Sequence, residues 1–575
     1  MNFAGHGAVP HATHEVTNQV PPLAGHDVSA DPALLDAITR ELGRDTAAAS
    51  QALAQLHDLG IQAGSAQAAE HARLANEHPP ALRTHNATGH RIDEVEFHPS
   101  WHALMGTAIG HGLHAAPWAD PSPGAHLTRA AKFYVWSQAE AGHGCPVSMT
   151  YAVVPALRHA PALAAQFEPL LTAPVYDPGL RPPQGKSGLL AGMAMTEKQG
   201  GSDVRAGTTR AQPAPSLGDG AHLLTGHKWF CSAPMCDMFL VLAQAPDGLT
   251  CFLLPRVLPD GTRNGMLLQR LKDKLGNRSN ASAEVEFDSA LAWQVGEAGR
   301  GVRTIIDMVT ATRLDCVLGS AAGMRRGTVT AVHHATYRQA FGKDLISQPL
   351  MANVLADLAI EAEAATALAI RLAGAAGRAA AGDAREAALL RVALPAAKHW
   401  VCKRFPVHAA EALECLGGNG YVEESGMPRL YREAPLNSIW EGSGNVTALD
   451  LLRALSAGRG TDPADALLAE LELAAGGNRR LDGAVAGVAS MLGEVRTAAG
   501  SDAAYAARRL AGAITVAVQA ALLVRYAPDV VADAFCASRL AAHPGTPGGP
   551  GVPFGMLPDG VGLGPILDRA RPAHR

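Results

Sequence analysis

Residues 191–203 read Ala-Gly-Met-Ala-Met-Thr-Glu-Lys-Gln-Gly-Gly-Ser-Asp, an apolar run that passes into a polar turn. Taken alone, this is an ordinary loop between strands, where glycine and aspartate supply the turn geometry. It can also be a binding site, because a flat ring with polar edge atoms needs hydroxyl and backbone donors, and glycines let the backbone come close. On the next strand, Gly-His-Lys-Trp-Phe-Cys-Ser at 226–232 places Trp229 and Phe230 beside a hydroxyl. The two segments together favour a binding site.

The chain around this turn, from about 186 to 298, consists of short apolar runs separated by glycine-containing turns, which is typical of β structure. One stretch has the period of two of a half-buried strand, with its apolar positions at Ala281, Ala283, Val285 and Phe287. Helical spacing precedes this region and returns after it, and Pro395 is expected to kink or break the later run. This order of helices, β domain and helices excludes the alternating pattern of a doubly wound sheet.

The sequence predicts six parts. They are a disordered leader (1–30), an N-terminal helical domain (31–185), a middle β domain (186–298), a helical bundle (299–460), a C-terminal helical domain (461–541) and a disordered tail rich in Pro and Gly (542–575).

Composition excludes several classes of protein. With 47 % hydrophobic and 18 % charged residues in 575, most of the chain should fold, and a net charge of −5 offers no overall attraction for nucleic acid or anionic lipid. Eight cysteines without a Cys-x-x-Cys pair suit free thiols in a reducing cytoplasm, and the leader lacks the features of a signal peptide. The apolar stretch 514–524 is too short to span a bilayer. We therefore expect a cytoplasmic protein with no membrane association.

Familiar nucleotide and metal motifs are missing. The chain has no Gly-x-Gly-x-x-Gly, and Gly185-Lys186-Ser187 lacks the first glycine of a phosphate loop because position 180 is Leu. Neither His14-Glu15 nor the pair Cys231 and Cys236 is completed at metal-binding spacing, so we expect no metal site.

The turn at 191–203 and the strand at 226–232 resemble the acyl-CoA dehydrogenase family, in which such segments hold the flavin ring of FAD. Three further segments resemble family motifs in the same order: Arg338-Gln-Ala-Phe-Gly342, Cys415-Leu-Gly-Gly-Asn-Gly-Tyr421 and Trp440-Glu-Gly-Ser-Gly-Asn445. Met193–Asp203, Arg270–Ala281 and Pro428–Asn445 resemble, nearly residue for residue, the AidB-like branch of the adaptive response to DNA alkylation. The resemblance covers about His14 to about Leu540.

The resemblance implies a mainly α fold with a central β domain. An N-terminal helical domain, a middle β-barrel and a C-terminal four-helix bundle would be followed by an extra C-terminal helical domain. The bundle would carry the FAD and catalytic segments of an oxidoreductase acting on CH–CH groups. The expected assembly is a homotetramer.

It also implies a set of cofactor contacts. They are Met195, Thr196, Gly201, Ser202, Phe230, Cys231, Ser232, Arg338, Phe341, Gly417, Gly418, Trp440, Gly442, Ser443 and Asn445. Ser202 would also lie near the substrate mouth, and Arg313 would bind substrate. Because the family builds flavin sites across subunit contacts, the segments at 338–341 and 417–418 would reach the FAD of a neighbouring subunit. The chain departs from many relatives at Ala340, where they have a hydroxyl, and at Glu414, where they have Gln.

Glu441 is the catalytic candidate. A surface glutamate beside a turn is usually only solvated. Here Trp440 offers an apolar wall, which would raise the pKa of the carboxylate and suit it to remove a weakly acidic α-proton, while Gly442 and Gly444 leave room for a substrate chain. Hydride would pass from the β-carbon to flavin N5. Relatives that place the base on the first long helix after the β domain would have it at Thr312, and threonine cannot serve.

Three functions stay open. The first is oxidation of acyl thioesters, including short branched ones such as isovaleryl-CoA. The second is a DNA-associated flavoprotein that deactivates alkylating agents or shields DNA, with weak acyl-CoA activity. The third is a structural flavoprotein without turnover. The resemblance favours the second, with 461–541 as the part that binds duplex DNA.

The net charge of the C-terminal part bears on whether it binds DNA. Residues 461–575 hold ten Arg and no Lys against eleven Asp plus Glu, a net of −1, whereas phosphate binding needs clustered cations. The candidates for a local stripe are Arg453, Arg459, Arg479, Arg480, Arg508 and Arg509. The alternative is a solvated helix face.

Overall fold

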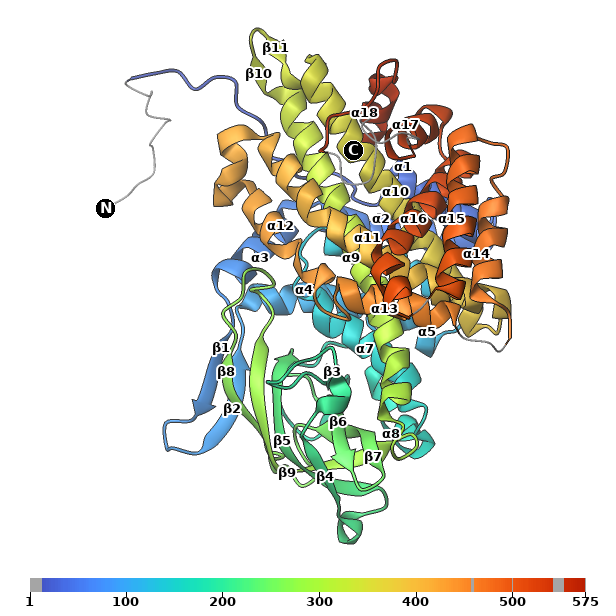
Figure 1. Cartoon of the computed structure of the whole chain (residues 1–575). Coiled ribbons are helices and arrows are strands. Elements are labelled where there is room, and N and C mark those ends of the chain that lie inside the picture. The colour runs from blue at the N-terminus through green and yellow to red at the C-terminus, as the bar shows by residue number, and fades with distance from the viewer. Residues whose placement is uncertain (1–12, 457–459, 499, 541–552, 574–575) are drawn as a thin grey trace.

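The computed structural model describes residues 13–456, 460–498, 500–540 and 553–573. A β domain forms one end of the molecule, at the bottom of Figure 1, and helices from both halves of the chain form the larger part above it. The mainly α architecture with a central β domain, predicted from the sequence, is confirmed.

The N-terminal part is helical except for one hairpin. Its elements are α1 (Pro32–Leu42), α2 (Ala47–Ala63), α3 (Ala66–Glu77), β1 (Ala81–His85), β2 (Arg91–Glu96), α4 (Pro99–Gly110), α5 (Ala116–Ala119), α6 (Ala125–Ser137), α7 (Gly144–Leu157) and α8 (Pro161–Leu171). The first helix begins as expected, because the Asp31 side chain accepts a hydrogen bond from the Ala33 amide and Pro32 occupies the first turn. The β1–β2 hairpin was not predicted.

The β domain is a closed barrel. Its strands are β3 (Ala191–Ala194), β4 (Arg210–Pro213), β5 (Ala221–Ser232), β6 (Met238–Ala245), β7 (Gly248–Pro255), β8 (Met266–Leu271) and β9 (Ser282–Val295). They follow the order β3-β6-β4-β5-β9-β7, with β8 paired to β9, and pairing between β6 and β7 closes the ring. The alternation predicted for 281–287 is confirmed, since all four apolar side chains are buried.

Long helices follow the barrel. They are α9 (Gly301–Tyr337), α10 (Pro349–Ala380), α11 (Ala384–Glu414), α12 (Met427–Glu433) and α13 (Gly444–Leu455), with the short hairpin β10 (Gln339–Ala340) and β11 (Lys343–Asp344) after α9. Of the kink or break predicted at Pro395, the break was wrong, because α11 continues through Pro395 and Pro406. The break falls earlier, where Asp383 caps the start of α11 with its side chain.

The C-terminal helices are α14 (Pro463–Glu472), α15 (Arg479–Thr497), α16 (Gly500–Tyr526), α17 (Asp529–Arg539) and α18 (Leu563–Ala570). They share one hydrophobic core with α9, α10, α11, the first four helices and α6. Buried ion pairs cross the same boundary, such as Arg371 with Glu470 at 2.9 Å and Arg539 with Glu361 at 3.0 Å. The second core joins the barrel to α7, α8 and the start of α9. The N-terminal segment therefore contributes to both cores.

Helix α16 is longer than the apolar stretch that the sequence shows within it. It spans 27 residues, long and apolar enough to cross a bilayer, so the shortness of 514–524 does not exclude a span. Within its most apolar window 78 % of the residues are buried inside the protein, as in a core helix.

Both predictions of terminal disorder were wrong for the described residues. In the leader, Val28 is buried and the Gly25 amide donates to the Gly64 carbonyl oxygen. In the tail, α18 is ordered and Phe554 lies under the Arg404 guanidinium, 4.5 Å from ring centroid to Cζ. The composition of these two segments gave no sign that single side chains would anchor them to the rest of the protein. Residues 1–12, 541–552 and 574–575 lie outside the described residues.

Candidate active site

The turn after β3 presents polar groups to the surface of the barrel. The Thr196 carbonyl oxygen accepts from the Trp229 amide at 2.8 Å, which ties the turn to β5. Gly201 is required here, because a Cβ at that position would lie 2.5 Å from Thr196 Oγ1. Within the described residues, neither the Thr196 nor the Ser202 hydroxyl has a hydrogen-bond partner. Both are therefore free to bind a ligand.

A buried ion pair fixes this turn. Its two residues were not among the predicted site residues. Glu197 accepts from Lys228 Nζ at 2.8 Å, and both side chains are about 1 % exposed. Burial opposes ionisation, but hydrogen bonds from Lys228, Thr208 and Thr209 outweigh it and lower the pKa of Glu197. The carboxylate therefore stays charged and locks the turn to β5. Lys228 lies next to the aromatic pair in sequence, but nothing in the sequence shows that it points inward.

The aromatic strand turns its side chains to opposite sides. Phe230 is 50 % exposed, whereas Cys231 is fully buried in the barrel. Ser232 is half-buried, with its Oγ 3.3 Å from that of Ser282. Lys272 Nζ lies 3.3 Å from the centroid of the Trp229 ring and 4.7 Å from that of Phe230. A ligand at this wall would meet Phe230 and Ser232 through side chains, but Cys231 only through its backbone.

Glu441 lies in a strained loop between α12 and α13. Its φ of 56° is in the left-handed region, which costs a non-glycine residue on the order of 1–3 kcal/mol. Trp440 packs against the barrel core, as expected for an apolar wall, and its Nε1 donates to Asn437 Oδ1 at 2.9 Å. Such strain persists only where neighbouring groups hold the backbone.

Thr312 contacts the candidate base directly. Its Oγ1 lies 2.6 Å from Glu441 Oε2, although the two residues are 129 positions apart. Burial raises the pKa of Glu441, while the Thr312 hydroxyl and the charges of Lys398 and Arg313 lower it in part. A carboxylate with a raised pKa and a single side-chain hydrogen bond is suited to accept a proton.

Two buried cations hold the backbone of this loop. Lys398 Nζ donates to the Trp440 carbonyl oxygen at 2.7 Å and to that of Gly442. Arg313 Nε donates to the Glu441 carbonyl oxygen at 2.9 Å, and its NH1 pairs with Asp450 at 2.7 Å. Three consecutive carbonyl groups are therefore bound by cations. The guanidinium of Arg313, predicted to bind substrate, is largely engaged within the fold.

The glycines of the loop lie against cationic side chains, and the room that they were expected to leave for a substrate chain stays a prediction. A Cβ on Gly442 would lie 3.1 Å from Arg313 NH2, and one on Gly444 would lie 2.4 Å from Lys403 Cε. Between them Ser443 precedes α13 without capping it by its side chain, and Asn445 is exposed.

Cys145 on α7 links the loop to the barrel wall. Burial raises the pKa of this thiol to about 12, and the charge of Glu441 adds to the effect, while Lys274 and a hydrogen bond with Ser232 oppose it. The charge of Glu441 and the hydroxyl of Ser232 therefore both affect this buried thiol. α7 packs against β3 where the helical part joins the barrel (Figure 1). Cys145 was not among the predicted site residues.

The segment 272–281 is fixed beside this site. The Asn277 amide donates to Glu433 Oε1 at 2.7 Å, and Ser279 Oγ donates to Glu140 Oε1 at 2.7 Å. Burial raises the pKa of Glu433 to about 7. The bond from Asn277 to Glu433 ties together two of the segments that carry the family resemblance, 270–281 and 428–445.

The remaining cofactor candidates lie elsewhere in a single chain. Arg338 caps the end of α9 and Phe341 lies in the β10–β11 turn, at the opposite end of the molecule from the barrel (Figure 1). Phe341 is 97 % exposed, and Gly417 and Gly418 have open space where a Cβ would be. The fold therefore brings together the residues at 195–202, 230–232 and 440–445, but not those at 338–341 or 417–418.

The two arginine doublets of the predicted stripe lie far apart. Arg479 and Arg480 begin α15, next to the end of α16, because a Cβ on Gly477 would lie 2.6 Å from Val524 Cγ1. Arg508 and Arg509 lie 16 and 15 residues before Val524 on α16, about 24 Å away at 1.5 Å per residue. Arg508 is instead near His399, whose pKa is lowered to about 4 by burial and further by that charge. Arg453 lies in the last turn of α13, and Arg459 lies outside the described residues.

The described residues contain no group of three or more His, Cys, Asp or Glu side chains placed to hold a metal ion.

Three family models match the chain in succession. Residues 18–178 match the N-terminal domain of the adaptive response protein AidB, 192–290 the middle domain of acyl-CoA dehydrogenases, and 299–456 their C-terminal domain.

Individual relatives agree. The AidB protein of Escherichia coli (strain K12) is 50 % identical over 448 residues, which cover 77 % of this chain and 81 % of the relative. The structure of Caenorhabditis elegans ACDH-11 in complex with C11-CoA aligns with a TM-score of 0.82 at 28 % identity, covering 92 % of this chain and 95 % of the other. The apo form of Bd2924 aligns with a TM-score of 0.81 at 30 % identity, covering 89 % of this chain and all of the other.

Proposed function

Because the chain belongs to the acyl-CoA dehydrogenase family, in its AidB branch, it is a FAD-dependent oxidoreductase of that type, and we propose Glu441 as its base. The observation that carries this proposal is the strained, cation-held loop that presents a carboxylate of raised pKa beside Thr312. The proposed reaction is removal of the α-proton of an acyl thioester by Glu441, with departure of a hydride from the β-carbon.

The residues at the barrel wall fit FAD. The Thr196 and Ser202 hydroxyls are free to hydrogen-bond a ring edge, and Phe230 offers an exposed face. When bound, FAD supplies the acceptor for the hydride. The glycine at 201 keeps Thr196 accessible, and the Glu197–Lys228 pair holds the turn in place. Purified protein should be yellow and carry FAD, and protein that neither contains nor takes up FAD would contradict this assignment.

An acyl-CoA is the proposed substrate class. C. elegans ACDH-11, with a TM-score of 0.82 to this chain, is in complex with C11-CoA. Short branched thioesters such as isovaleryl-CoA are the first to test, and an alkylating agent is the second class proposed.

A homotetramer is the proposed assembly. Phe341 and Tyr421, which are 97 % and 82 % exposed in one chain, lie in the segments that the resemblance assigns to the FAD of a neighbouring subunit. Covering these apolar side chains would remove a cost of hydration. The proposed location of the assembly is the cytoplasm.

A second function, protection of DNA from alkylating agents, has its own support. Of the nine described arginines after residue 460, five have a carboxylate partner: Arg496, Arg525, Arg539, Arg569 and Arg571. The other four, without a carboxylate partner among the described residues, are Arg479, Arg480, Arg508 and Arg509. Arg453 likewise has none there. Unpaired guanidinium groups are available to DNA phosphates.

One pair of assays tests both functions. Dye reduction with short acyl-CoAs measures dehydrogenation, and gel shifts with duplex DNA at several salt concentrations measure phosphate contacts. Turnover without DNA binding would favour a metabolic acyl-CoA dehydrogenase. Neither turnover nor DNA binding would leave a flavoprotein without either activity.

A further inference from the structure

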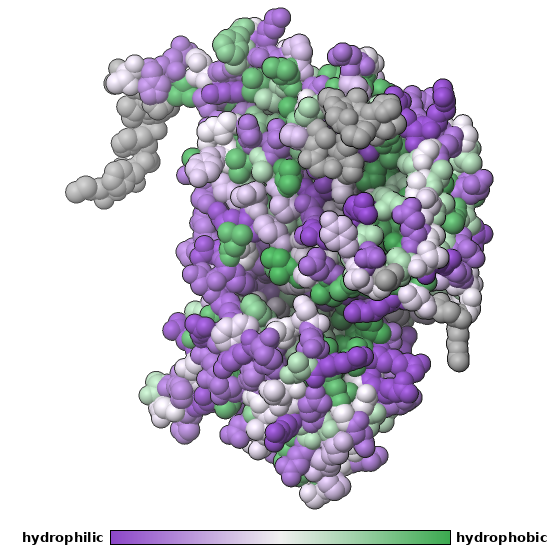
Figure 2. Space-filling view, in the orientation of Figure 1, coloured by the Kyte–Doolittle hydropathy of each residue, from purple (hydrophilic) through white to green (hydrophobic). Residues whose placement is uncertain are grey.

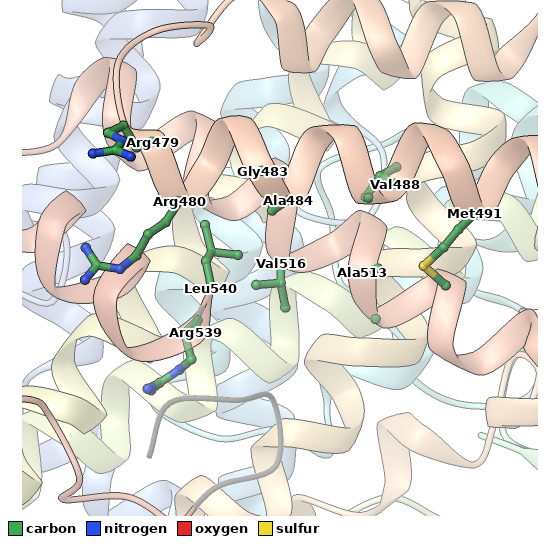
Figure 3. Close-up of a pocket in the computed structure, with 12 residues that line it drawn as sticks. Arg479, Arg480, Gly483, Ala484, Val488, Met491, Ala513, Val516, Arg539 and Leu540 are labelled. Carbon is green, nitrogen blue, oxygen red and sulfur yellow. The ribbon is translucent and has the colours of Figure 1, made fainter. Parts of the chain in front are cut away.

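A groove lies between α15, α16 and the end of α17, away from the catalytic loop. Its volume is about 720 Å³, and none of its lining residues belongs to the turn at 195–202 or the loop at 440–445. Figure 3 shows Arg479 and Arg480 at one end of α15 and Met491 near the other end of the groove. In Figure 2 hydrophobic surface is visible over the region where these helices lie in Figure 1.

Small and apolar side chains form the walls. On α15 they are Gly483, Ala484, Gly487, Val488 and Met491, and on α16 they are Gly512, Ala513 and Val516. Glycine inside a helix costs stability, yet a Cβ on Gly483 or Gly487 would meet nothing within 4 Å. The missing side chains leave the groove open along α15.

In the described part of the chain, unpaired cationic side chains lie at only one end of the groove. Arg479 and Arg480 are exposed and have no carboxylate partner among the described residues, and they occupy the first turn of a 19-residue helix, where the helix dipole also favours an anion. The third arginine of the lining, Arg539, is already paired with Asp357 and Glu361. The unbalanced positive charge of the groove is therefore at the start of α15.

We propose that this groove binds a fatty acyl carboxylate, with the carboxylate at Arg479 and Arg480 and the hydrocarbon chain along α15 toward Met491. A phosphate backbone would satisfy the arginines but has no hydrocarbon to cover the apolar walls. From Arg480 to Met491 the helix rises about 16 Å, which an extended chain of roughly a dozen carbons fills. This site is additional to the proposed catalytic function and does not depend on it.

Calorimetric titration of the FAD-loaded protein with dodecanoate, below its micelle concentration, tests the proposal. We expect saturable binding with one site per chain, at least about tenfold weaker in the Arg479→Ala/Arg480→Ala variant, because charge-assisted hydrogen bonds are lost. Dodecyltrimethylammonium, with the same chain and the opposite charge, should not bind this site. Acetate, with the same head group and no chain, should bind too weakly to measure.

A matched pair of glycine variants separates this groove from other apolar sites. Gly487→Leu fills the groove and should abolish dodecanoate binding. Gly493→Leu, on the same helix and also facing open space but outside the lining, should leave binding unchanged. Circular dichroism and FAD content check that both variants fold.

Three outcomes would overturn the proposal. They are equal binding of dodecanoate by the Gly487→Leu and Gly493→Leu variants, equal binding of the cationic and anionic amphiphiles, and binding that emerges only when residues 541–552 are replaced by a short linker. The last would mean that the chain itself occupies the groove.

Discussion

Cationic side chains lie at both the loop from Trp440 to Gly442 and the start of α15, but the surroundings of those side chains differ. At the loop, Lys398 and Arg313 are buried and their donors are bound to backbone carbonyl groups. At α15, Arg479 and Arg480 are exposed and have no acidic partner among the described residues. Cations of the first kind hold a backbone conformation, and those of the second kind are available to a ligand.

Buried and exposed cations have different roles in this chain. A buried cation must find partners inside the protein, because desolvation of an unpaired charge is costly. An exposed cation keeps its hydration until an anion replaces it. Variants at the loop should therefore change the rate of chemistry, whereas variants at the exposed arginines should change binding alone.

The largest effect is expected from Glu441→Gln. The amide keeps the shape of the side chain but cannot accept the α-proton, so turnover of acyl-CoA should fall by about a thousandfold or more. FAD content should not change, which absorbance measures on the same sample. Glu414→Gln, an exposed carboxylate changed to the residue found in many relatives, is the matched control. Undiminished turnover in Glu441→Gln would place the base elsewhere.

Lys398→Met should come next. Removing the ammonium group frees the carbonyl groups of Trp440 and Gly442 and lets the strained loop relax, and a displacement of about 1 Å can cost on the order of a hundredfold in rate. We expect a lower kcat with little change in KM, and partial rescue by Lys398→Arg. Lys403→Met, one turn further along α11 and bonded to Ser438 instead, should have a smaller effect. Equal losses in both variants would argue against a specific role for Lys398.

Much of this arrangement could be predicted from the sequence, because it depends on local patterns. The alternation at 281–287 predicted a half-buried strand, the turn after residue 195 was singled out by its residue types, and the loop at 440–445 was identified by its resemblance to a family motif. Glu441 was identified by the resemblance of Trp440–Asn445 to a family motif, and its neighbour Trp440 packs against the barrel core.

What the sequence could not supply were contacts between distant segments. Thr312 was considered only as an unsuitable base, yet it donates to Glu441 across 129 positions. Lys398 lies in an alanine-rich helical stretch without any local sign of its role. The arginine doublets were expected to form one stripe. The start of α15 instead lies beside the end of α16, so the doublets lie at opposite ends of this helix pair. Each result depends on how helices pack, which periodicity alone does not determine.

A moderate effect is expected on DNA. If Arg508 and Arg509 contact phosphates, Arg508→Ala/Arg509→Ala should weaken duplex binding for all sequences alike and reduce the slope of log K against log salt by about two. FAD content and acyl-CoA turnover should stay unchanged. Arg496→Ala is the matched control, because Arg496 is on a neighbouring helix and already paired with Asp462. An unchanged salt slope in the double variant would exclude this end of α16 from the DNA contact.

The smallest effect is expected from Thr312→Val, and it is a shift in pH dependence. Burial raises the pKa of Glu441, and the Thr312 hydroxyl partly offsets this by donating to the ionised carboxylate. Removing the hydroxyl disfavours the ionised form, so the pKa should rise further and a higher pH is needed before Glu441 can accept a proton. The acid limb of kcat/KM should therefore move upward by about one pH unit, since a hydrogen bond to a charged group contributes about 1.5 kcal/mol or more. At pH values well above this limb the rate should not fall, because the base is ionised there and is intrinsically stronger. Thr310→Val, on the same helix with its hydroxyl bonded to the Ile306 carbonyl oxygen, should leave the profile in place. A limb that stays in place or moves to lower pH in Thr312→Val would mean that the hydroxyl does not stabilise the charged carboxylate during the reaction.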